Sequence, residues 1–307
     1  MHNSPGRSGA TASDDVRCWA GLSLERPRIM GVLNVTPDSF SDGGDFLEPD
    51  AAIAAGLAMS AAGADIVDVG GESTRPSSQS TPSTVERARI IPVIRALAAK
   101  GVCVSVDSRH AETMAAALDA GAKIVNDVYA LAYDPAAAPV IAAHGCPVVL
   151  MHMRGTPSEM YAQAHYIDVA GEVVAELRER VEAAQRAGIR RDNIAVDPGI
   201  GFAKTAEQSI ELLHRLPELL TLGCPIVVGV SRKSFIGAIT GENNPRNRLP
   251  GSLAAALFAL ARGATILRVH DVGETMQAVK VWQTLGMLPL PGQQGLQAGM
   301  VRETESR

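Results

Sequence analysis

The chain has 307 residues, of which 46% are hydrophobic and 20% are charged, and its formal net charge is −5. This apolar content is enough for a large buried core and excludes a chain that is disordered over most of its length. Acidic and basic residues are mixed along the chain without a basic stripe, so we expect no nucleic-acid partner. No stretch reaches the roughly 18 apolar residues of a membrane span, and the beginning of the chain carries no apolar signal segment. We therefore expect no membrane partner and a soluble, cytoplasmic protein.

Eight apolar runs of strand length recur along the chain, and segments of helical period separate them. The runs are RIMGVLN from Arg28, ADIVDVG from Ala64, VCVSVD from Val102, AKIVN from Ala122, PVVLMH from Pro147, NIAVD from Asn193, PIVVGVS from Pro225 and TILRVH from Thr265. The clearest helical segments are AAIAAGLAMSAAG, TVERARIIPVIRALAAKG and VAGEVVAELRERVEAAQRAG, and each ends on a glycine, which is typical of a helix C-terminus. Runs that are apolar throughout favour a parallel sheet buried on both faces. Eight strand–helix units predict an α/β fold, a single (β/α)8 TIM barrel.

An open, doubly wound sheet is the structural alternative to this barrel. Its usual marker, a G-x-G-x-x-G motif after the first strand, is absent from the sequence. The residues before Pro27 are rich in Ser, Gly and Asp, and those after Met287 contain Pro, Gly and Gln. We therefore expect a flexible N-terminal extension over 1–27, the barrel over 28–286 and a C-terminal tail over 287–307.

Polar residues stand at or just after the end of every predicted strand, which is where a (β/α)8 barrel builds its active site. They are Asn34, the GGESTRP segment, Asp107, Asn126 with Asp127, His152, Asp197, the SRKS segment from Ser231, and Arg268 with His270. Each of them, taken singly, also has an ordinary explanation as a helix cap or a satisfied core residue. Their recurrence at all eight ends favours a common site.

These residues fall into two groups by their hydrogen-bonding chemistry. One group offers acceptors, which suit an edge rich in N–H donors such as an aminopyrimidine: Asp107, Asn126 and Asp197. The other group offers donors, which suit phosphate or carboxylate oxygens: Arg75, Lys233, Arg268 and His270. A ligand that carries both chemistries fits this pattern best.

Two further positions refine the donor group. The amide oxygen of Asn34 is the kind of ligand that Mg²⁺ takes while it keeps several waters and substrate phosphates. The SRKS segment stands at a strand-to-helix junction, where free N–H groups attract an anion, and Ser234 is a candidate to hold a carboxylate. The alternative, that Ser231 only caps the helix, leaves Lys233 without an explanation.

Several long motifs then occur in a fixed order along the chain. They are GVLNVTPDSFSDGG, DVGGESTRP, VSVDS, IVNDV, MHMRGTP, DPGIGFAKT, GVSRKSF and RVHDV. In this order they closely resemble the dihydropteroate synthase family, enzymes of bacterial folate biosynthesis, over residues from about 28 to 286. The resemblance implies a Mg²⁺-dependent condensation of dihydropterin-hydroxymethyl diphosphate with 4-aminobenzoate, giving dihydropteroate and pyrophosphate. It also implies that the enzyme is a target of sulfonamides, because GFAKT lacks the extra residue found in resistant relatives.

The same resemblance assigns roles to individual residues. It implies a pterin diphosphate site made of Thr74, Asp107, Asn126, Met151, Asp197, Lys233, Arg268 and His270. It implies a 4-aminobenzoate site made of Asp38, Phe40, Arg75, Pro76, Phe202 and Ser234. Asn34 is the implied Mg²⁺ ligand, and the implied catalytic residues are Lys233, Arg268, His270 and Asp107.

Two other functions remain open at this point. A methyltetrahydrofolate-dependent corrinoid methyltransferase shares the pterin-binding barrel, but it needs no pyrophosphate site such as the one expected around Arg268 and His270. A non-catalytic pterin-binding paralogue is the other possibility, and the presence of every transferred residue argues against it. The family is usually a homodimer, and the apolar helix GSLAAALFALARG either faces the barrel or lies in an interface.

Overall fold

Eight parallel strands form a closed barrel in the computed structural model, which describes residues 17–36, 49–72, 81–155, 162 and 164–286. The strands are β3 (Arg28–Asn34), β4 (Ile66–Gly70), β5 (Val104–Asp107), β6 (Ile124–Asp127), β7 (Val148–Met151), β8 (Ile194–Asp197), β9 (Val227–Val228) and β10 (Ile266–Val269). Their order in the sheet is β8-β7-β6-β5-β4-β3-β10-β9. A parallel bridge between Val196 and Ile226 joins the two edges of the sheet. This closure confirms the predicted (β/α)8 barrel and excludes the open, doubly wound sheet.

All eight predicted strands occur at the apolar runs. The runs are apolar because both faces of each strand are buried. Alternate residues point to opposite faces of a strand. In β3, Ile29 packs in the cluster between the sheet and the helices, whereas Met30 packs in a second cluster with Ile66 and Ile124 inside the barrel. Each strand therefore contributes to two cores, and this is why its sequence is predominantly apolar instead of alternating.

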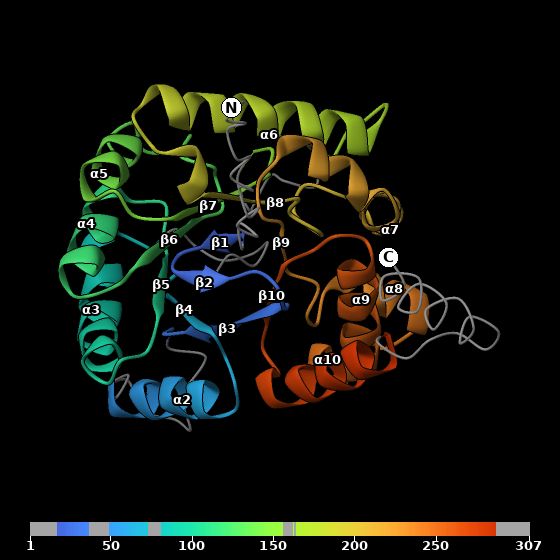
Figure 1. Ribbon diagram of the computed structural model, residues 1–307, viewed down its shortest axis with the longest axis horizontal. Coiled ribbons are helices and arrows are strands. Elements are labelled where there is room, and N and C mark those ends of the chain that lie inside the picture. The colour runs from blue at the N-terminus through green and yellow to red at the C-terminus, as the bar shows by residue number, and fades with distance from the viewer. Residues whose placement is uncertain (1–16, 37–48, 73–80, 156–161, 163, 287–307) are drawn as a thin grey trace, which may run out of the picture.

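Helices surround the barrel on its outer side (Figure 1). They are α2 (Pro49–Ala61), α3 (Ser83–Ala99), α4 (Ala111–Asp119), α5 (Ala137–His144), α6 (Val169–Arg186), α7 (Ala206–His214), α8 (Ser234–Thr240), α9 (Leu249–Ala261) and α10 (Val272–Gly286). Short 3-10 helices lie at η1 (Arg191–Asn193), η2 (Leu216–Leu222) and η3 (Pro245–Asn247). The three clearest predicted helices correspond to α2, α3 and α6. Within the part of the chain that the structure describes, no helix is both long enough and apolar enough to cross a membrane.

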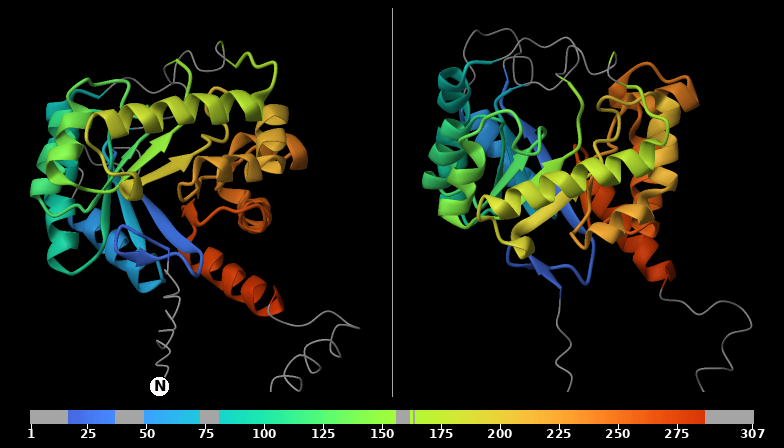
Figure 2. Two further views of the ribbon diagram at one scale, coloured as in Figure 1. Left: turned by 45° about the horizontal axis from the view of Figure 1, so that its top comes forward. Right: turned by 90° about the horizontal axis from the view of Figure 1, so that it is seen from above.

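A short β-hairpin precedes the barrel, formed by β1 (Cys18–Trp19) and β2 (Leu22–Ser23). It lies at the end of the barrel where the strands begin, in blue in Figure 2. Trp19 is 1% exposed, packs in the apolar cluster inside the barrel, and donates a hydrogen bond from Nε1 to the carbonyl of Asn193 at 3.0 Å. Residues 17–27 therefore differ from the expected flexible extension, because one large aromatic side chain fills the base of the barrel.

Candidate active site

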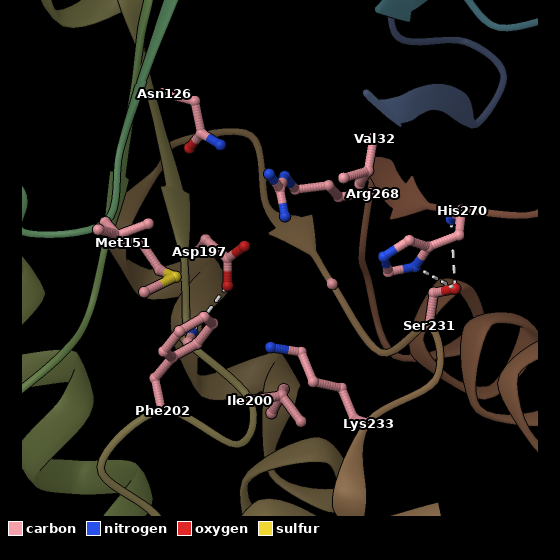
Figure 3. A pocket seen from close by; sticks show the side chains of 13 residues that line it. Val32, Asn126, Met151, Asp197, Ile200, Phe202, Ser231, Lys233, Arg268 and His270 are labelled. Atoms are coloured by element: carbon pink, nitrogen blue, oxygen red, sulfur yellow. Dashed lines mark hydrogen bonds between the residues drawn. The ribbon is translucent and has the colours of Figure 1, made fainter. Parts of the chain in front are cut away.

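A cavity of about 470 Å³ lies among residues at the carboxyl ends of the strands and in the loops that follow them (Figure 3). Its lining consists of Val32, Asn126, Val128, Met151, Asp197, Gly199, Ile200, Phe202, Gly229, Ser231, Lys233, Arg268 and His270. Seven of these were expected from the sequence, namely Asn126, Met151, Asp197, Phe202, Lys233, Arg268 and His270. These seven residues come from the ends of five strands, which are far apart in the sequence, and they meet at one place.

Arg268 links the two chemical groups of the site. Its Nε donates to Oδ2 of Asp68 at 2.7 Å, and its Nη2 donates to Oδ2 of Asp107 at 2.6 Å. The amide of Asn126 donates to the same Asp68 oxygen at 3.0 Å. Although burial opposes the charged form of Arg268, the two carboxylates raise its pKa above the usual value, so the guanidinium stays charged. Asp107 therefore lies behind Arg268 and does not itself line the cavity.

Asp107 is a buried carboxyl group with a raised pKa, and it shares the Arg268 cation with a second acid, Asp68. Burial raises the pKa of Asp107 from 3.8 to about 7, Arg268 opposes this rise, and the nearby Asp68 adds to it. Its side chain is 13% exposed. The alternative role of Asp107 as a cap is not observed, since the N-cap residue of α4 is His110 and the first N–H of that helix, on Ala111, donates to Asp134.

The neighbouring Asp127 does serve as an ordinary capping residue. Its two carboxylate oxygens accept hydrogen bonds from the backbone N–H groups of Tyr129 and Leu131, at 2.8 and 2.9 Å. It is fully buried and does not line the cavity. Some of the polar residues at the strand ends are therefore structural, as Asp127 is, whereas others line the cavity, as Asn126 and Asp197 do.

Asp197 and Lys233 face the cavity from β8 and from the turn before α8 (Figure 3). The Asp197 carboxylate accepts a hydrogen bond from the N–H of Gly199 at 2.7 Å, and burial raises its pKa. Burial, together with the nearby charge of Arg268, lowers the pKa of Lys233 from 10.5 to about 8. The Lys233 ammonium lies 3.8 Å from the centre of the Phe202 ring, which is a favourable cation–π distance.

The turn that presents Lys233 is held by interactions of its own. Arg232 has a φ of +61°, in the left-handed region, and its guanidinium forms an ion pair with Asp271. Its backbone N–H donates to the hydroxyl of Ser252 at 2.9 Å. These contacts, from α9 and the segment after β10, fix the backbone immediately before the lysine.

His270 lies across the cavity from Met151 and is oriented by Ser231 (Figure 3). The Ser231 hydroxyl is 3.0 Å from His270 Nδ1 and also accepts from the His270 backbone N–H at 3.2 Å. Ser231 thus positions a histidine rather than only capping a helix. Burial, together with the nearby charges of Arg232 and Arg268, lowers the pKa of His270 from 6.5 to about 4. At neutral pH the imidazole is therefore uncharged and can donate one hydrogen bond from its ring.

The remaining expected residues have different outcomes. Asn34 ends β3 beside Gly70 of β4 and is partly buried. Ser234 begins α8 and is exposed. The other expected site residues lie outside the described residues: Asp38, Phe40, Thr74, Arg75 and Pro76.

Sequence reasoning missed one residue at the centre of the site. Asp68 is fully buried in β4, and its Oδ1 atom has no hydrogen-bond partner. The available signal was a carboxylate inside an otherwise apolar strand, IVDVG. A buried charge requires a partner, and Arg268 supplies it from β10, which is separated from β4 only by β3. Attention to the strand ends alone therefore overlooked it.

A closed (β/α)8 barrel with one polar cavity at its strand ends defines a barrel enzyme that binds a small molecule. Residues 30–270 match the family model described as pterin binding enzyme. The dihydropteroate synthase of Mycobacterium leprae is 47% identical over 266 residues, which cover 85% of this chain and 94% of that protein. The chain therefore belongs to the dihydropteroate synthase family.

Solved structures agree with this assignment. A structure of the Xanthomonas albilineans dihydropteroate synthase with 4-aminobenzoic acid has a TM-score of 0.83 and 48% identity, covering 88% of this chain and 97% of that one. A structure of the enzyme from the same organism in complex with 7,8-dihydropteroate has a TM-score of 0.80 and 45% identity, covering 87% and 97%. The chain is thus similar to these enzymes over nearly their whole length.

Proposed function

We propose that this protein is a dihydropteroate synthase (EC 2.5.1.15) of tetrahydrofolate biosynthesis. It condenses (7,8-dihydropterin-6-yl)methyl diphosphate with 4-aminobenzoate and releases pyrophosphate. The observation that carries the proposal is the division of one cavity into an acceptor side, with Asn126 and Asp197, and a donor side, with Arg268 and His270. A substrate with a donor-rich ring at one end and a diphosphate at the other matches that division.

The pterin ring is assigned to the acceptor side of the cavity. Asn126 and Asp197, which line the cavity, accept from its N–H groups, and Lys233 donates to its ring acceptors. Asp107 accepts from the ring where the ring displaces the Nη2 group of Arg268. Met151 is 5% exposed and lines the cavity, where it packs on the face of the ring. The ring is thereby oriented, with its methylene carbon directed toward the donor side.

The diphosphate is assigned to the donor side, where Arg268, His270 and Thr74 bind its oxygens. Asn34 is the proposed protein ligand of Mg²⁺. Among the described residues, no group of three or more His, Cys, Asp or Glu side chains is arranged to hold a metal ion. This donor set fits Mg²⁺ only if water and the substrate phosphates complete its shell, as is usual for that ion. When bound, the ion would neutralise charge on the leaving group.

The 4-aminobenzoate is assigned to the loops around Phe202, with Ser234 near its carboxylate. Arg75, Pro76, Asp38 and Phe40 complete this pocket in the proposal. Sulfonamides resemble the aryl amine, so we expect them to compete with 4-aminobenzoate for the enzyme.

The chemistry requires charge stabilisation and positioning more than a covalent nucleophile. The bond between the pterin methylene carbon and the diphosphate oxygen breaks, and Arg268 and His270 stabilise the charge that develops on that oxygen. The amine nitrogen of 4-aminobenzoate forms the new bond to carbon and loses a proton. Asp107 and Asp197 hold the pterin in place while its ring carries partial positive charge.

Pyrophosphate release by the purified protein tests the proposal directly. We expect release only when both substrates and Mg²⁺ are present, and inhibition of that release by a sulfonamide in competition with 4-aminobenzoate. A folded protein that binds the pterin diphosphate in calorimetry but releases no pyrophosphate would be the non-catalytic paralogue. Methyl transfer from methyltetrahydrofolate to a corrinoid would instead favour the methyltransferase.

We also propose that the enzyme is a cytoplasmic homodimer whose catalytic unit spans residues 28–286. Three large apolar side chains remain 40–64% exposed on α9 and α10, namely Phe258, Val281 and Leu285. These two helices pack on each other. Light scattering measures the mass in solution, and a monomer at micromolar concentration would refute the dimer.

A further inference from the structure

A buried lysine lies beside the candidate active site without lining it. Lys204 is 1% exposed and belongs to the loop between β8 and α7. Its ammonium nitrogen donates to the carbonyls of Gly199 and Phe202, at 3.2 and 3.0 Å. It also lies 2.9 Å from Nδ1 of His152, which follows β7. Burial lowers the pKa of Lys204 from 10.5 to about 7, but the three acceptors around its nitrogen match the three donors of the ammonium form. None of these contacts is assigned to a substrate.

The loop that Lys204 holds has a backbone conformation that the chain does not favour. Gly199, Gly201 and Ala203 have φ values of +67°, +77° and +49°. Alanine is disfavoured in this left-handed region. A Cβ atom at Gly199 would lie 2.0 Å from the carbonyl oxygen of His152, so this loop approaches the end of β7 closely. The cross-links from Lys204 thus stabilise an unfavourable loop conformation.

The lysine is itself held by a chain of polar contacts that reaches the surface. Because Lys204 donates to Nδ1, the proton of the His152 ring is on Nε2, which donates to Glu176 at 3.0 Å. Burial, with the nearby Lys204 charge, lowers the pKa of His152 to about 4, so the ring is neutral. Glu176 in turn accepts from Arg154. The carboxylate thereby compensates the buried ammonium through the imidazole.

We infer that Lys204 is a positioning residue for the aryl-amine half of the reaction, acting through the carbonyls of Gly199 and Phe202 to set the place of the Phe202 ring. The ring meets Lys233 at 3.8 Å and lines the cavity. The Asp197 carboxylate also contacts this loop through the Gly199 N–H, but the Asp197 backbone is held independently, because its strand pairs with Met151 and its carbonyl accepts from the His152 N–H. The inference rests on the proposed function for the identity of the aryl substrate. It predicts that the loss of Lys204 impairs the binding of 4-aminobenzoate and leaves the binding of the pterin diphosphate nearly unchanged.

The test is Lys204→Met, which keeps an unbranched side chain only one atom shorter and removes its donors. We expect the KM for 4-aminobenzoate to rise about tenfold or more, since small misplacements in a site have large effects. The kcat should change less than about threefold. The dissociation constant of the pterin diphosphate, measured by calorimetry, should also change less than about threefold. An unchanged KM, or equal losses for both substrates, would overturn the inference.

Thr205→Ala is the matched control in the same loop. Thr205 caps α7 and accepts from the N–H of Gln208, but it makes no contact with the lysine network. Its loss should lower stability and leave both KM values within about twofold of the wild type. A KM shift equal to that of Lys204→Met would mean that any loosening of the loop has the same effect, which would contradict a specific role.

A second variant serves if Lys204→Met does not fold. The Glu176 side chain is 37% exposed on α6, so Glu176→Ala is tolerated more easily while it still removes the acceptor from His152. We expect a rise of about threefold or more in the KM for 4-aminobenzoate, and an unchanged KM refutes the inference.

Amide hydrogen exchange separates this inference from the proposed function. The Phe202 N–H is bonded to the carbonyl of Gly199, so Lys204→Met, or Glu176→Ala in its place, should speed its exchange relative to the wild type. Faster exchange in a protein whose wild type releases no pyrophosphate would refute the synthase and retain the loop support. Turnover by the wild type with an unchanged exchange rate in the variant would retain the synthase and refute the loop support.

Discussion

Glu86 is a buried acid on α3 whose ionisation should destabilise the folded protein. Its side chain is fully buried, and its Oε2 accepts from the hydroxyls of Ser108 and Thr113 at 3.0 and 2.7 Å. Its Oε1 has no hydrogen-bond partner. Burial raises the pKa of Glu86 from 4.5 to about 7, although the two hydroxyls oppose the shift. The carboxylate is therefore less stable in the folded chain than in water.

The sign and size of the effect follow from this shift in pKa. A raised pKa in the folded state means that the folded protein binds the proton more tightly than the unfolded one. The resulting stability is present below pH 4.5 and is lost as the pH rises to about 7. At 1.36 kcal/mol per pKa unit, the shift corresponds to about 3 kcal/mol in the free energy of unfolding.

Glu86→Gln removes this ionisation and keeps an oxygen for the two hydroxyls. We expect the variant to be more stable than the wild type by about 1–3 kcal/mol at pH 8, and the gain to shrink by about half at pH 5.5. Urea unfolding followed by circular dichroism measures both values. Glu112→Gln is the control, since the Glu112 side chain is 68% exposed and the change should be within about 0.5 kcal/mol. Equal or lower stability of Glu86→Gln at pH 8 would refute the reasoning.

Four further substitutions test the site and the base of the barrel. Lys233→Ala should weaken the binding of both substrates, because the ammonium lies between Asp197 and Phe202, and unaltered binding in calorimetry would contradict this. Asp107→Ala should weaken the pterin diphosphate alone, by about tenfold or more; a matching loss for 4-aminobenzoate would count against it. Asp68→Asn should lower kcat/KM by about tenfold or more, because Arg268 loses a charged partner, and activity within twofold would refute that. Trp19→Ala should reduce the free energy of unfolding by about 3–5 kcal/mol without changing KM, and urea unfolding with a small loss would refute the role of the hairpin.

The barrel was predictable because all eight of its strands show the same apolar sequence pattern. Parallel strands that are buried on both faces are predominantly apolar, and each of the eight runs has that property apart from single polar residues such as Asp68 and Arg268. The polar residues that interrupt this pattern at the strand ends were predictable for the same reason. A polar group such as Asn126 or Asp197 is costly in a buried strand unless it has a partner, so its place after an apolar run marks the site.

Other features depend on contacts that the pattern does not reveal. The hairpin has strands of two residues, too short for a periodic signal, and its stability depends on Trp19 meeting the base of the barrel. Lys204 lies in the loop motif GFAKT, where a lysine is ordinarily expected to face solvent. Only the folded chain shows that it is buried against His152.

Arg268 explains why the acceptor and donor sides of the cavity act together. It is the cation shared by Asp68 and Asp107. In the proposed function, N–H donors of the pterin that reach Asp107 would compete with the Nη2 group of the arginine for the same carboxylate. A guanidinium released from that bond would keep its Nε bond to Asp68 and have N–H groups free for a diphosphate oxygen. Asp68 would then anchor the arginine while the partner of its Nη2 group changes from Asp107 to the leaving group.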